Sequence, residues 1–174
     1  SIDISTLKNK TYEEVALCVI HPFVDGEISE SDLQKIIEDS YKEFSHPKIA
    51  PVINICENKY ILELFYGPTF AFKDYALQFL GNLFNYALPK ASKKLTVLGA
   101  TSGDTGSAAI HAFRGKDDIN LYILHPHDRV SEVQRRQMTT VQDNNIFNIA
   151  IKGSFDDCQK IVKELFVDEE LQDH

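Results

Sequence analysis

The N-terminal part of the chain has the apolar spacing of two helices. Thr11 opens a capping-box pattern, and apolar residues then recur at helical spacing as far as Pro22. The stretch from 33 to 44 has the same spacing and is followed by His46-Pro47. Because proline disfavours helical backbone in the residue before it, we expect the first helix to end at Pro22 and the second to end before His46.

Two extended runs follow these helices. Residues 51–55 and 60–65 are rich in β-branched and aromatic side chains, and they flank the polar Glu57-Asn58-Lys59. This arrangement is typical of two strands joined by a short turn. It predicts a β-hairpin whose second strand is broken by Gly67-Pro68.

From Lys73 onward, helical patterns alternate with short apolar runs. The runs at 95–98, 119–124 and 146–151 predict buried strands. The helical patterns around them are bounded by prolines and capping residues: one ends at Pro89, one covers 108–113, one runs from Ser131 to Thr140, and one begins at Ser154. Parallel strands need crossover connections, so we predict an α/β protein whose helical and hairpin N-terminal portion precedes an open parallel sheet with helices on its faces.

A glycine-rich segment follows the first of these strands and leads into a helix. It reads Gly99-Ala-Thr-Ser-Gly-Asp-Thr-Gly106. Glycines allow a ligand to approach the backbone, and the N–H groups at a helix start attract anions, so the segment is a candidate anion site. The glycine spacing matches neither a dinucleotide-binding fingerprint nor a P-loop, which disfavours a nicotinamide oxidoreductase. The alternative is a tight turn without a ligand, capped by Asp104.

Lys73 stands at the predicted start of a helix, where the helix dipole disfavours a cation. It follows an aromatic turn in which Thr69 is expected to cap that helix, the alternative being that its hydroxyl donates to a phosphate. A lysine amine that loses its proton in an apolar setting is a Schiff-base nucleophile. The residues themselves leave two interpretations open, an activated amine or a surface lysine paired with Asp74 or another acid.

Composition excludes several function classes. The chain has 174 residues, 43% of them apolar, and a net charge of −8, which favours a globular protein and argues against nucleic acid as a partner. Its three cysteines show no CxxC spacing, and its histidines show no metal-ligand spacing, so we expect reduced thiols, a cytoplasmic location and no metal. The apolar runs are too short to cross a bilayer, and neither end has the pattern of a natural terminus, which suggests a fragment.

Four segments together resemble the threonine synthase family. They are Glu63–Asp74 with Leu77-Gln78, Gly99–Ala109, Arg129–Thr140 and Gly153–Gln159. The resemblance covers nearly the whole chain but well under half of a complete family member. It implies a pyridoxal 5'-phosphate enzyme of fold type II, which converts O-phosphohomoserine and water to L-threonine and phosphate.

The resemblance also implies roles for individual residues. Lys73 aligns with the lysine that binds the cofactor as an imine and then moves protons at the substrate's α and β carbons. The loop that binds the substrate α-carboxylate, beside the cofactor, matches Thr101, Ser102, Gly103, Asp104, Thr105 and Gly106, and Asp104 is expected to contact the cofactor as well. Arg129 follows a strand end, and its guanidinium suits the phosphate of the substrate.

Two residues depart from the family pattern. Tyr66 stands where the family usually has histidine before Gly-Pro-Thr, and Asp128 replaces a common glycine before Arg129. Any role of that histidine is therefore in doubt here, and the turn at Asp128 is expected to differ.

The same resemblance predicts an incomplete site. Residues 1–70 are expected to belong to a larger, incomplete domain, and residues 71–174 to a small α/β domain that carries Lys73 and the glycine loop. The groups that hold the cofactor phosphate and the pyridine nitrogen are expected beyond His174, so we expect the isolated chain to bind pyridoxal phosphate weakly and to turn over poorly. The alternative function is that of a phosphometabolite-binding α/β domain without covalent chemistry.

Overall fold

The computed structural model describes residues 2–169. The chain forms two compact units, of which the first ends at Leu83 and the second begins at Phe84. This boundary lies inside a helix, and the domain division between residues 70 and 71 stays a prediction. The first unit contains, in chain order, η1 (Ile4–Leu7), α1 (Tyr12–Val24), α2 (Glu30–Tyr41), β1 (Val52–Cys56), β2 (Lys59–Leu62) and the first part of α3 (Asp74–Ala91).

The helix starts of the first unit follow the predicted caps. The Thr11 hydroxyl accepts a hydrogen bond from the Glu14 N–H at 3.2 Å, and the Glu14 carboxylate accepts one from the Thr11 N–H at 2.7 Å. Ser29 caps α2. The predicted helix ends at Pro22 and Pro89 were wrong, because α1 continues to Val24 and α3 to Ala91. A proline near the end of a helix removes one hydrogen bond, which a helix that is packed on its neighbours tolerates.

An apolar core joins the helices of the first unit. Leu33 and Ile37 of α2 are fully buried, and side chains from α1 and from the start of α3 pack around them. The hydroxyl of Tyr75 in α3 donates to the Ile49 carbonyl at 2.7 Å, and the Tyr41 hydroxyl donates to the Tyr75 carbonyl at 3.0 Å. Burial raises the pKa of Tyr41 far above its usual range, so this hydroxyl remains a donor.

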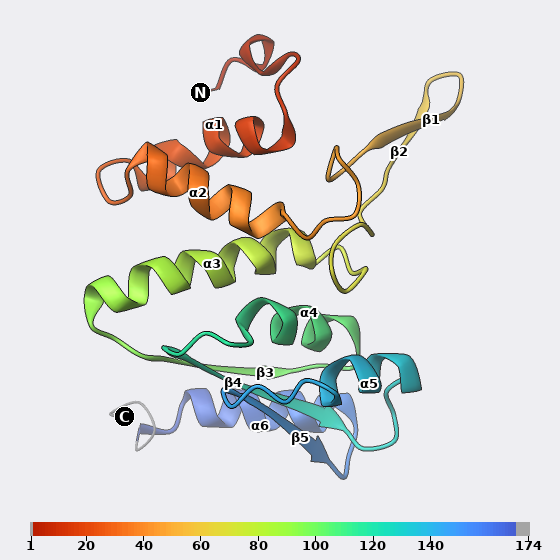
Figure 1. Ribbon diagram of the computed structural model, residues 1–174. Coiled ribbons are helices and arrows are strands. Elements are labelled where there is room, and N and C mark those ends of the chain that lie inside the picture. The colour runs from red at the N-terminus through yellow and green to blue at the C-terminus, as the bar shows by residue number, and fades with distance from the viewer. Residues whose placement is uncertain (1, 170–174) are drawn as a thin grey trace. The chain divides into compact units, whose positions relative to one another are not determined.

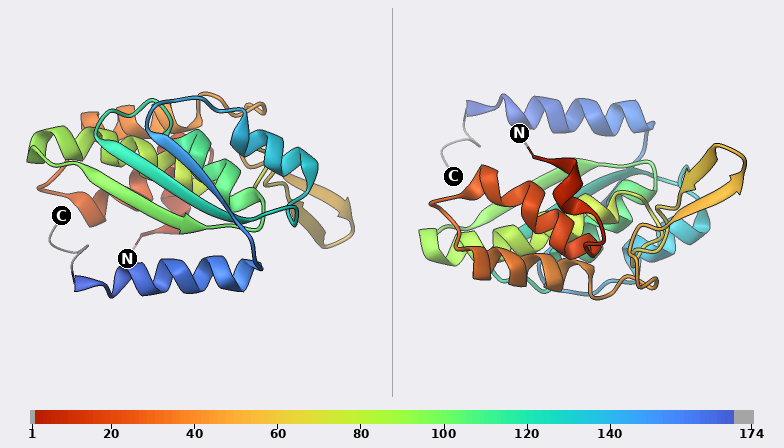
Figure 2. Two further views of the ribbon diagram at one scale, coloured as in Figure 1. Left: turned by 90° about the horizontal axis from the view of Figure 1, so that it is seen from below. Right: turned by 90° about the horizontal axis from the view of Figure 1, so that it is seen from above.

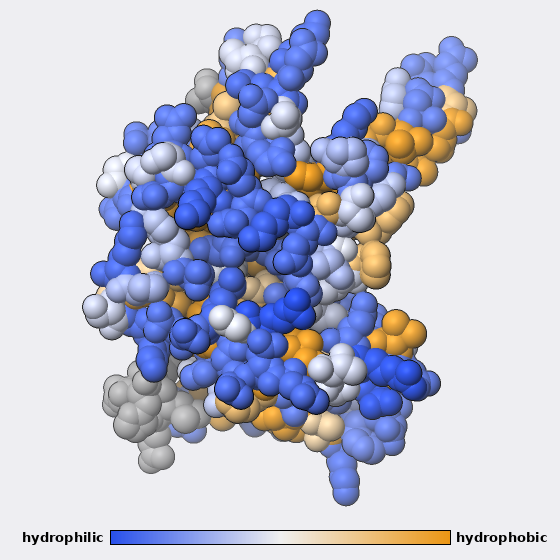
Figure 3. Space-filling model, in the orientation of Figure 1, coloured by the Kyte–Doolittle hydropathy of each residue, from blue (hydrophilic) through white to orange (hydrophobic). Residues whose placement is uncertain are grey.

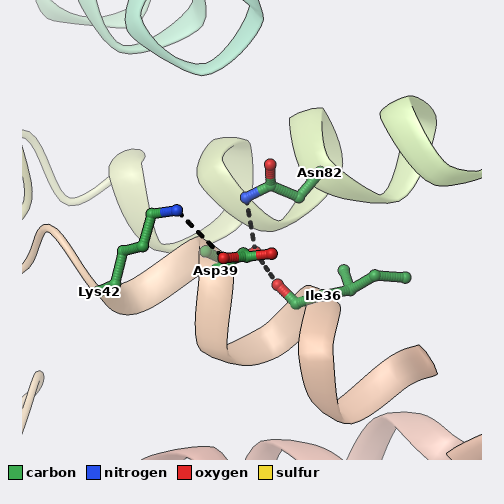
Figure 4. A network of polar contacts seen from close by, with 5 residues as sticks. Ile36, Asp39, Lys42 and Asn82 are labelled. Carbon is green, nitrogen blue, oxygen red and sulfur yellow. Dashed lines mark hydrogen bonds and ion pairs between the residues drawn. The ribbon is translucent and has the colours of Figure 1, made fainter. Parts of the chain in front are cut away.

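A polar contact also ties α3 to α2. The Asn82 amide of α3 donates to the Ser40 hydroxyl at 3.1 Å, and the Ser40 hydroxyl donates to the Ile36 carbonyl (Figure 4). Ser40 is buried, so this bond satisfies a polar group that water does not reach. The N-terminal half of α3 is therefore fixed within the first unit.

The β1–β2 hairpin forms as predicted, with antiparallel pairing from Val52 opposite Leu62 to Cys56 opposite Lys59. All residues of both strands are exposed, including the large apolar Val52 and Tyr60. Figure 3 shows hydrophobic surface along the hairpin, where these exposed apolar side chains lie. A two-stranded hairpin is only marginally stable alone, so covering this apolar surface would stabilise it.

The second unit is a parallel sheet with helices on both faces. It contains, in chain order, β3 (Leu95–Ala100), α4 (Asp104–Phe113), β4 (Ile119–Pro126), α5 (Glu132–Thr139), β5 (Ile146–Ile151) and α6 (Phe155–Phe166). The strand order is β3-β4-β5, with Leu95 beside Ile119 and Leu121 beside Ile146 (Figure 2). Helices α4 and α5 cover one face and α6 lies on the other (Figure 1). The predicted α/β class and parallel sheet are confirmed.

The carboxyl ends of the three strands lie at one edge of this sheet, where the strand-to-helix loops begin. The glycine-rich loop follows β3, and Arg129 follows β4. Within residues 2–169, no helix is both long and apolar enough to cross a membrane.

A pair of substitutions tests the core of the first unit. Leu33 is fully buried and Phe23 is 84% exposed. We expect Leu33→Ala to lower the free energy of unfolding by about 2–5 kcal/mol, the usual cost of truncating a buried leucine, and Phe23→Ala to change it little. Urea unfolding of the two variants checks this, and equal losses would contradict the core described here.

Candidate active site

A tight turn precedes Lys73. The Phe70 N–H donates to the Gly67 carbonyl at 3.1 Å, with Pro68 and Thr69 between them. Phe70 has a φ of 62°, in the left-handed region that bulky side chains rarely adopt, and its ring is 69% exposed. Such backbone strain persists only where surrounding contacts fix the conformation, and it is often found at functional sites.

The contact that fixes this turn comes from Asp74, the first residue of α3. Its side chain is fully buried, and its two carboxylate oxygens accept the Thr69 N–H at 2.8 Å and the Thr69 hydroxyl at 2.6 Å. A Cβ on Gly67 would lie 2.5 Å from the Cβ of Asp74, so only glycine fits there. Thr69 therefore does not cap the helix as predicted, because its hydroxyl donates to a side chain five residues further along.

Lys73 lies between this turn and α3, and it is half-buried. Its Nζ lies 4.3 Å from the centroid of the Phe72 ring, whose side chain is exposed. Aromatic faces attract cations, so Phe72 gives the Lys73 side chain a preferred position. The Lys73 carbonyl accepts the Leu77 N–H at 2.9 Å, so its backbone already belongs to the first turn of α3.

The glycine-rich loop after β3 is organised by Thr101. Its side chain is buried, and its hydroxyl accepts the N–H groups of Gly103 at 3.1 Å and Gly106 at 2.9 Å. The same hydroxyl donates to the Gly103 carbonyl at 3.1 Å. Thr101 thus supports the loop from inside, whereas Ser102, Asp104 and Thr105 are exposed.

Two glycines of this loop lie close to side chains of α5. A Cβ on Gly103 would lie 2.6 Å from the Gln134 amide nitrogen, and one on Gly106 would lie 2.7 Å from the Met138 sulfur. The sequence analysis did not identify Gln134 and Met138 as part of the site. Their helical spacing on α5 was visible in the sequence, but the packing of α5 against the start of α4 was not.

The N-terminus of α4 has the properties of an anion site. Gly103 occupies the N-cap position and has no side chain to cap the helix, Asp104 is the first helical residue, and the Thr101 hydroxyl accepts the N–H of Gly106 in the first turn. Asp104 therefore does not cap the helix, as it would in the alternative of a tight turn without a ligand. The helix has ten residues, long enough for its dipole to attract an anion to the N–H groups at its start.

Arg129 lies in the loop after β4 and is exposed. Asp128 before it has a φ of 56°, which explains why glycine suits this position and why aspartate is among the residues that tolerate it. The Asp157 carboxylate, at the start of α6, accepts the Ser154 N–H at 2.7 Å and the Ser154 hydroxyl at 2.8 Å. These bonds lower the pKa of Asp157, and the positive charges of Lys160 and Arg129 lower it further.

Tyr66 lies next to the turn and serves the local structure. Its hydroxyl donates to Glu63 at 2.8 Å, and its carbonyl accepts the Ser45 N–H at 2.9 Å. The bond to Glu63 raises the pKa of Tyr66, because it stabilises the protonated hydroxyl. Tyr66 is thus a neutral donor at neutral pH.

The candidate residues fall into both compact units. Lys73 belongs to the first, whereas Thr101–Gly106 and Arg129 belong to the second. A cleft of about 610 Å³ between α1 and α2 is lined by residues such as Lys10, Glu14 and Glu38, and by none of the candidates. Among residues 2–169, no cluster of His, Cys, Asp and Glu has the geometry of a metal site.

Known proteins resemble this chain over nearly its whole length. A family model described as "Threonine synthase N terminus" matches residues 1–41. Threonine synthase from Pseudomonas aeruginosa is 51% identical to this chain. The aligned region covers 96% of this chain and 36% of the Pseudomonas aeruginosa protein. The crystal structure of PLP-bound threonine synthase from Brucella melitensis superposes with a TM-score of 0.90, at 46% identity over 96% of the chain. The chain belongs to the threonine synthase family.

The match covers only part of the relatives. The threonine synthase structure from yeast also superposes with a TM-score of 0.90, at 42% identity over 98% of the chain, yet the chain covers 37% of it. The chain therefore spans about a third of the length of the threonine synthases that it matches.

The packing of α4 against α5 predicts unequal effects of two glycine substitutions. Gly106→Ala places a methyl group against Met138 and Thr101, so we expect it to lower the free energy of unfolding by about 1–3 kcal/mol, as overpacking does. Gly99→Ala is the matched control, because its Cβ would meet Ile123 at an ordinary 3.4 Å. Chemical denaturation measures both, and an equal loss of stability in the two variants would contradict the loop described here.

The capping box of α6 predicts how Asp157 titrates. Its pKa in the folded state lies below the unfolded value, so its contribution to stability is present above the usual carboxyl range and is lost as pH falls through the lowered pKa. We expect Ser154→Ala to return the Asp157 pKa part of the way to its ordinary value, since the Ser154 N–H still donates. Carboxyl titration by NMR measures this shift, and an unchanged Asp157 pKa in the variant would exclude the hydroxyl as a cause.

Proposed function

We propose that the full-length protein is a threonine synthase of fold type II, a cytoplasmic lyase that uses pyridoxal phosphate to convert O-phosphohomoserine and water to L-threonine and phosphate. The similarity to the PLP-bound threonine synthase of Brucella melitensis carries this proposal, with 46% identity and a TM-score of 0.90 over 96% of the chain. The chain covers 36% of that structure, so it would supply only part of the active site.

The residues of this chain fit the cofactor in two respects. Lys73 provides a half-buried primary amine at a turn whose conformation is fixed, and the N-terminus of α4, with glycine at its N-cap, has a dipole that attracts anions. Pyridoxal phosphate, when bound, supplies an aldehyde that reacts with an amine and a ring that stores the electrons released at the substrate's α carbon.

Lys73 is the amine that we propose for the bond to the cofactor. After the substrate displaces it, its Nζ would take a proton from the α carbon and move protons at the β carbon. The Lys73 Nζ lies 4.3 Å from the centroid of the Phe72 ring, whose face attracts a cation. A base fixed at a defined place transfers protons faster than one that samples many positions.

The glycine loop is proposed to bind the substrate α-carboxylate. Ser102 and Thr105 are exposed at the start of α4, where their hydroxyls can donate to a carboxylate that the helix N-terminus attracts. Gly103 and Gly106 leave room for the side chains of Gln134 and Met138 beside this end of the helix, and the Thr101 hydroxyl accepts the N–H groups of both glycines. Asp104 would contact the cofactor, and the exposed Arg129 would contact the substrate phosphate.

A labelling experiment tests the role of Lys73. The full-length protein is mixed with pyridoxal phosphate, reduced with borohydride and digested, and we expect the modified peptide to contain Lys73. Lys73→Ala should remove that adduct and lower the rate of threonine formation from O-phosphohomoserine by at least about 100-fold, as expected for loss of a general base. Lys90→Arg, which changes a lysine near the end of α3, is the control and should leave both unchanged.

Other outcomes of this experiment would contradict the proposed role of Lys73 or favour a different function. An adduct on a different lysine, or none, would contradict the proposed role of Lys73. If Lys73→Ala also left the affinity for the phosphorylated substrate unchanged in a protein without an adduct, the chain would belong to a binding domain without covalent chemistry. Normal turnover by the isolated 174-residue chain would contradict the proposal that the site is completed by residues outside it.

A further inference from the structure

The Asp74 carboxylate is buried beside a proposed catalytic lysine, and no step assigned above uses it. Asp74 is fully buried, whereas aspartate is seldom buried without a specific partner. Its two oxygens accept the N–H and the hydroxyl of the same residue, Thr69. This pair of bonds satisfies the buried carboxylate and also ties Asp74 to Thr69.

The two hydrogen bonds close the segment from Thr69 to Asp74 into a short ring of covalent and hydrogen bonds, and Lys73 is part of this ring. Thr69 and Asp74 are its ends, and they are joined by bonds of 2.8 and 2.6 Å. Inside the ring, the Asp74 N–H donates to the Ala71 carbonyl at 3.0 Å, and Ala71 is buried. Lys73 immediately precedes the residue that closes the ring, so its backbone has little freedom to move.

The same ring contains the strained residue of the turn. Phe70 has a φ of 62°, which costs free energy for a bulky side chain, and its exposed ring gains little from packing. Gly67 has no room for a side chain, because a Cβ there would lie 2.5 Å from the Cβ of Asp74. These contacts hold a conformation that the sequence Thr69–Phe72 would not adopt alone.

We propose that Asp74 is a positioning residue for Lys73, which acts by clamping Thr69 and thereby fixing the place from which Nζ reaches the cofactor. We assign it no catalytic role, because its carboxylate is fully buried and is bonded to Thr69 of its own turn. This inference rests on the proposed function, in that a fixed lysine matters only if Lys73 binds the cofactor. Its test includes a readout that does not depend on the cofactor.

The first pair of variants separates the hydrogen bonds of Asp74 from its charge. Asp74→Asn keeps the size of the side chain, and its amide can still accept the Thr69 N–H and donate to the Thr69 hydroxyl. Asp74→Ala removes both bonds. In the full-length protein we expect Asp74→Ala to slow formation of the reducible adduct at Lys73 by roughly 10- to 100-fold, the scale on which misplacing a reacting group costs rate, and Asp74→Asn to restore most of it.

A second pair keeps the test decisive if Asp74→Ala does not fold. Thr69→Val removes only the hydroxyl, and Thr69→Ser retains it. We expect Thr69→Val to slow adduct formation several-fold and Thr69→Ser to resemble the unmodified protein. Ser40→Ala, which removes a buried hydrogen bond elsewhere in the first unit, controls for general destabilisation and should leave the rate unchanged.

The readout without cofactor is amine labelling. Protein free of pyridoxal phosphate is treated briefly with acetic anhydride, and modification of Lys73 is compared with that of Lys90 by peptide mass spectrometry. A loosened ring exposes Lys73 to a small reagent, so Asp74→Ala and Thr69→Val should raise the Lys73/Lys90 ratio while they slow the reaction with the cofactor. A protein that is merely unfolded would label both lysines faster.

Three results would overturn the inference. They are unchanged rates and ratios in Asp74→Ala and Thr69→Val, equal defects in Asp74→Asn and Asp74→Ala, and an equal defect in Ser40→Ala. Failure of the unmodified protein to form an adduct at Lys73 would instead contradict the proposed function, and the labelling ratio would still test the clamp.

Discussion

One buried carboxylate determines the local structure around the candidate lysine. Asp74 accepts two hydrogen bonds from Thr69, and hydrogen bonds to a charged group contribute about 1.5–3 kcal/mol each. Without them the charge would be buried and unpaired, which costs several kcal/mol. The turn that begins at Gly67, the strained Phe70 and the start of α3 therefore form together, and Lys73 is held between them.

The anchoring of α3 continues deeper into the first unit. Tyr75, directly after Asp74, donates to Ile49, and Tyr41 donates to the Tyr75 carbonyl. Further along, Asn82 bonds to Ser40 of α2. The helix that follows the lysine is thus fixed at successive turns by side chains of the apolar core. A reactive amine on such a helix start keeps its place better than one on an exposed loop.

Much of this fold could be predicted from local sequence patterns. Thr11 and Ser154 cap helices as predicted, and the three apolar runs became parallel strands. The prolines misled the prediction, because tertiary packing carries α1 beyond Pro22. Local patterns specify which elements form, whereas packing decides where they end.

The supporting contacts of the candidate site could not be predicted in the same way. The candidate loop and lysine were visible as motifs, but the packing of Gln134 and Met138 against Gly103 and Gly106 joins separate helices. Thr69 was expected to cap a helix, yet it bonds to Asp74, because the turn between them folds back on itself. A sequence motif indicates which residues are candidates for the site. Their contacts with other helices are seen only in the folded structure.

The most direct test of the whole account is a crystal structure of the full-length protein with pyridoxal phosphate. It should show a covalent bond from Nζ of Lys73 to the aldehyde carbon of the cofactor, with both Asp74–Thr69 hydrogen bonds retained. Attachment of the cofactor to another residue, or a bond to Lys73 formed with the Asp74–Thr69 contact broken, would contradict the account.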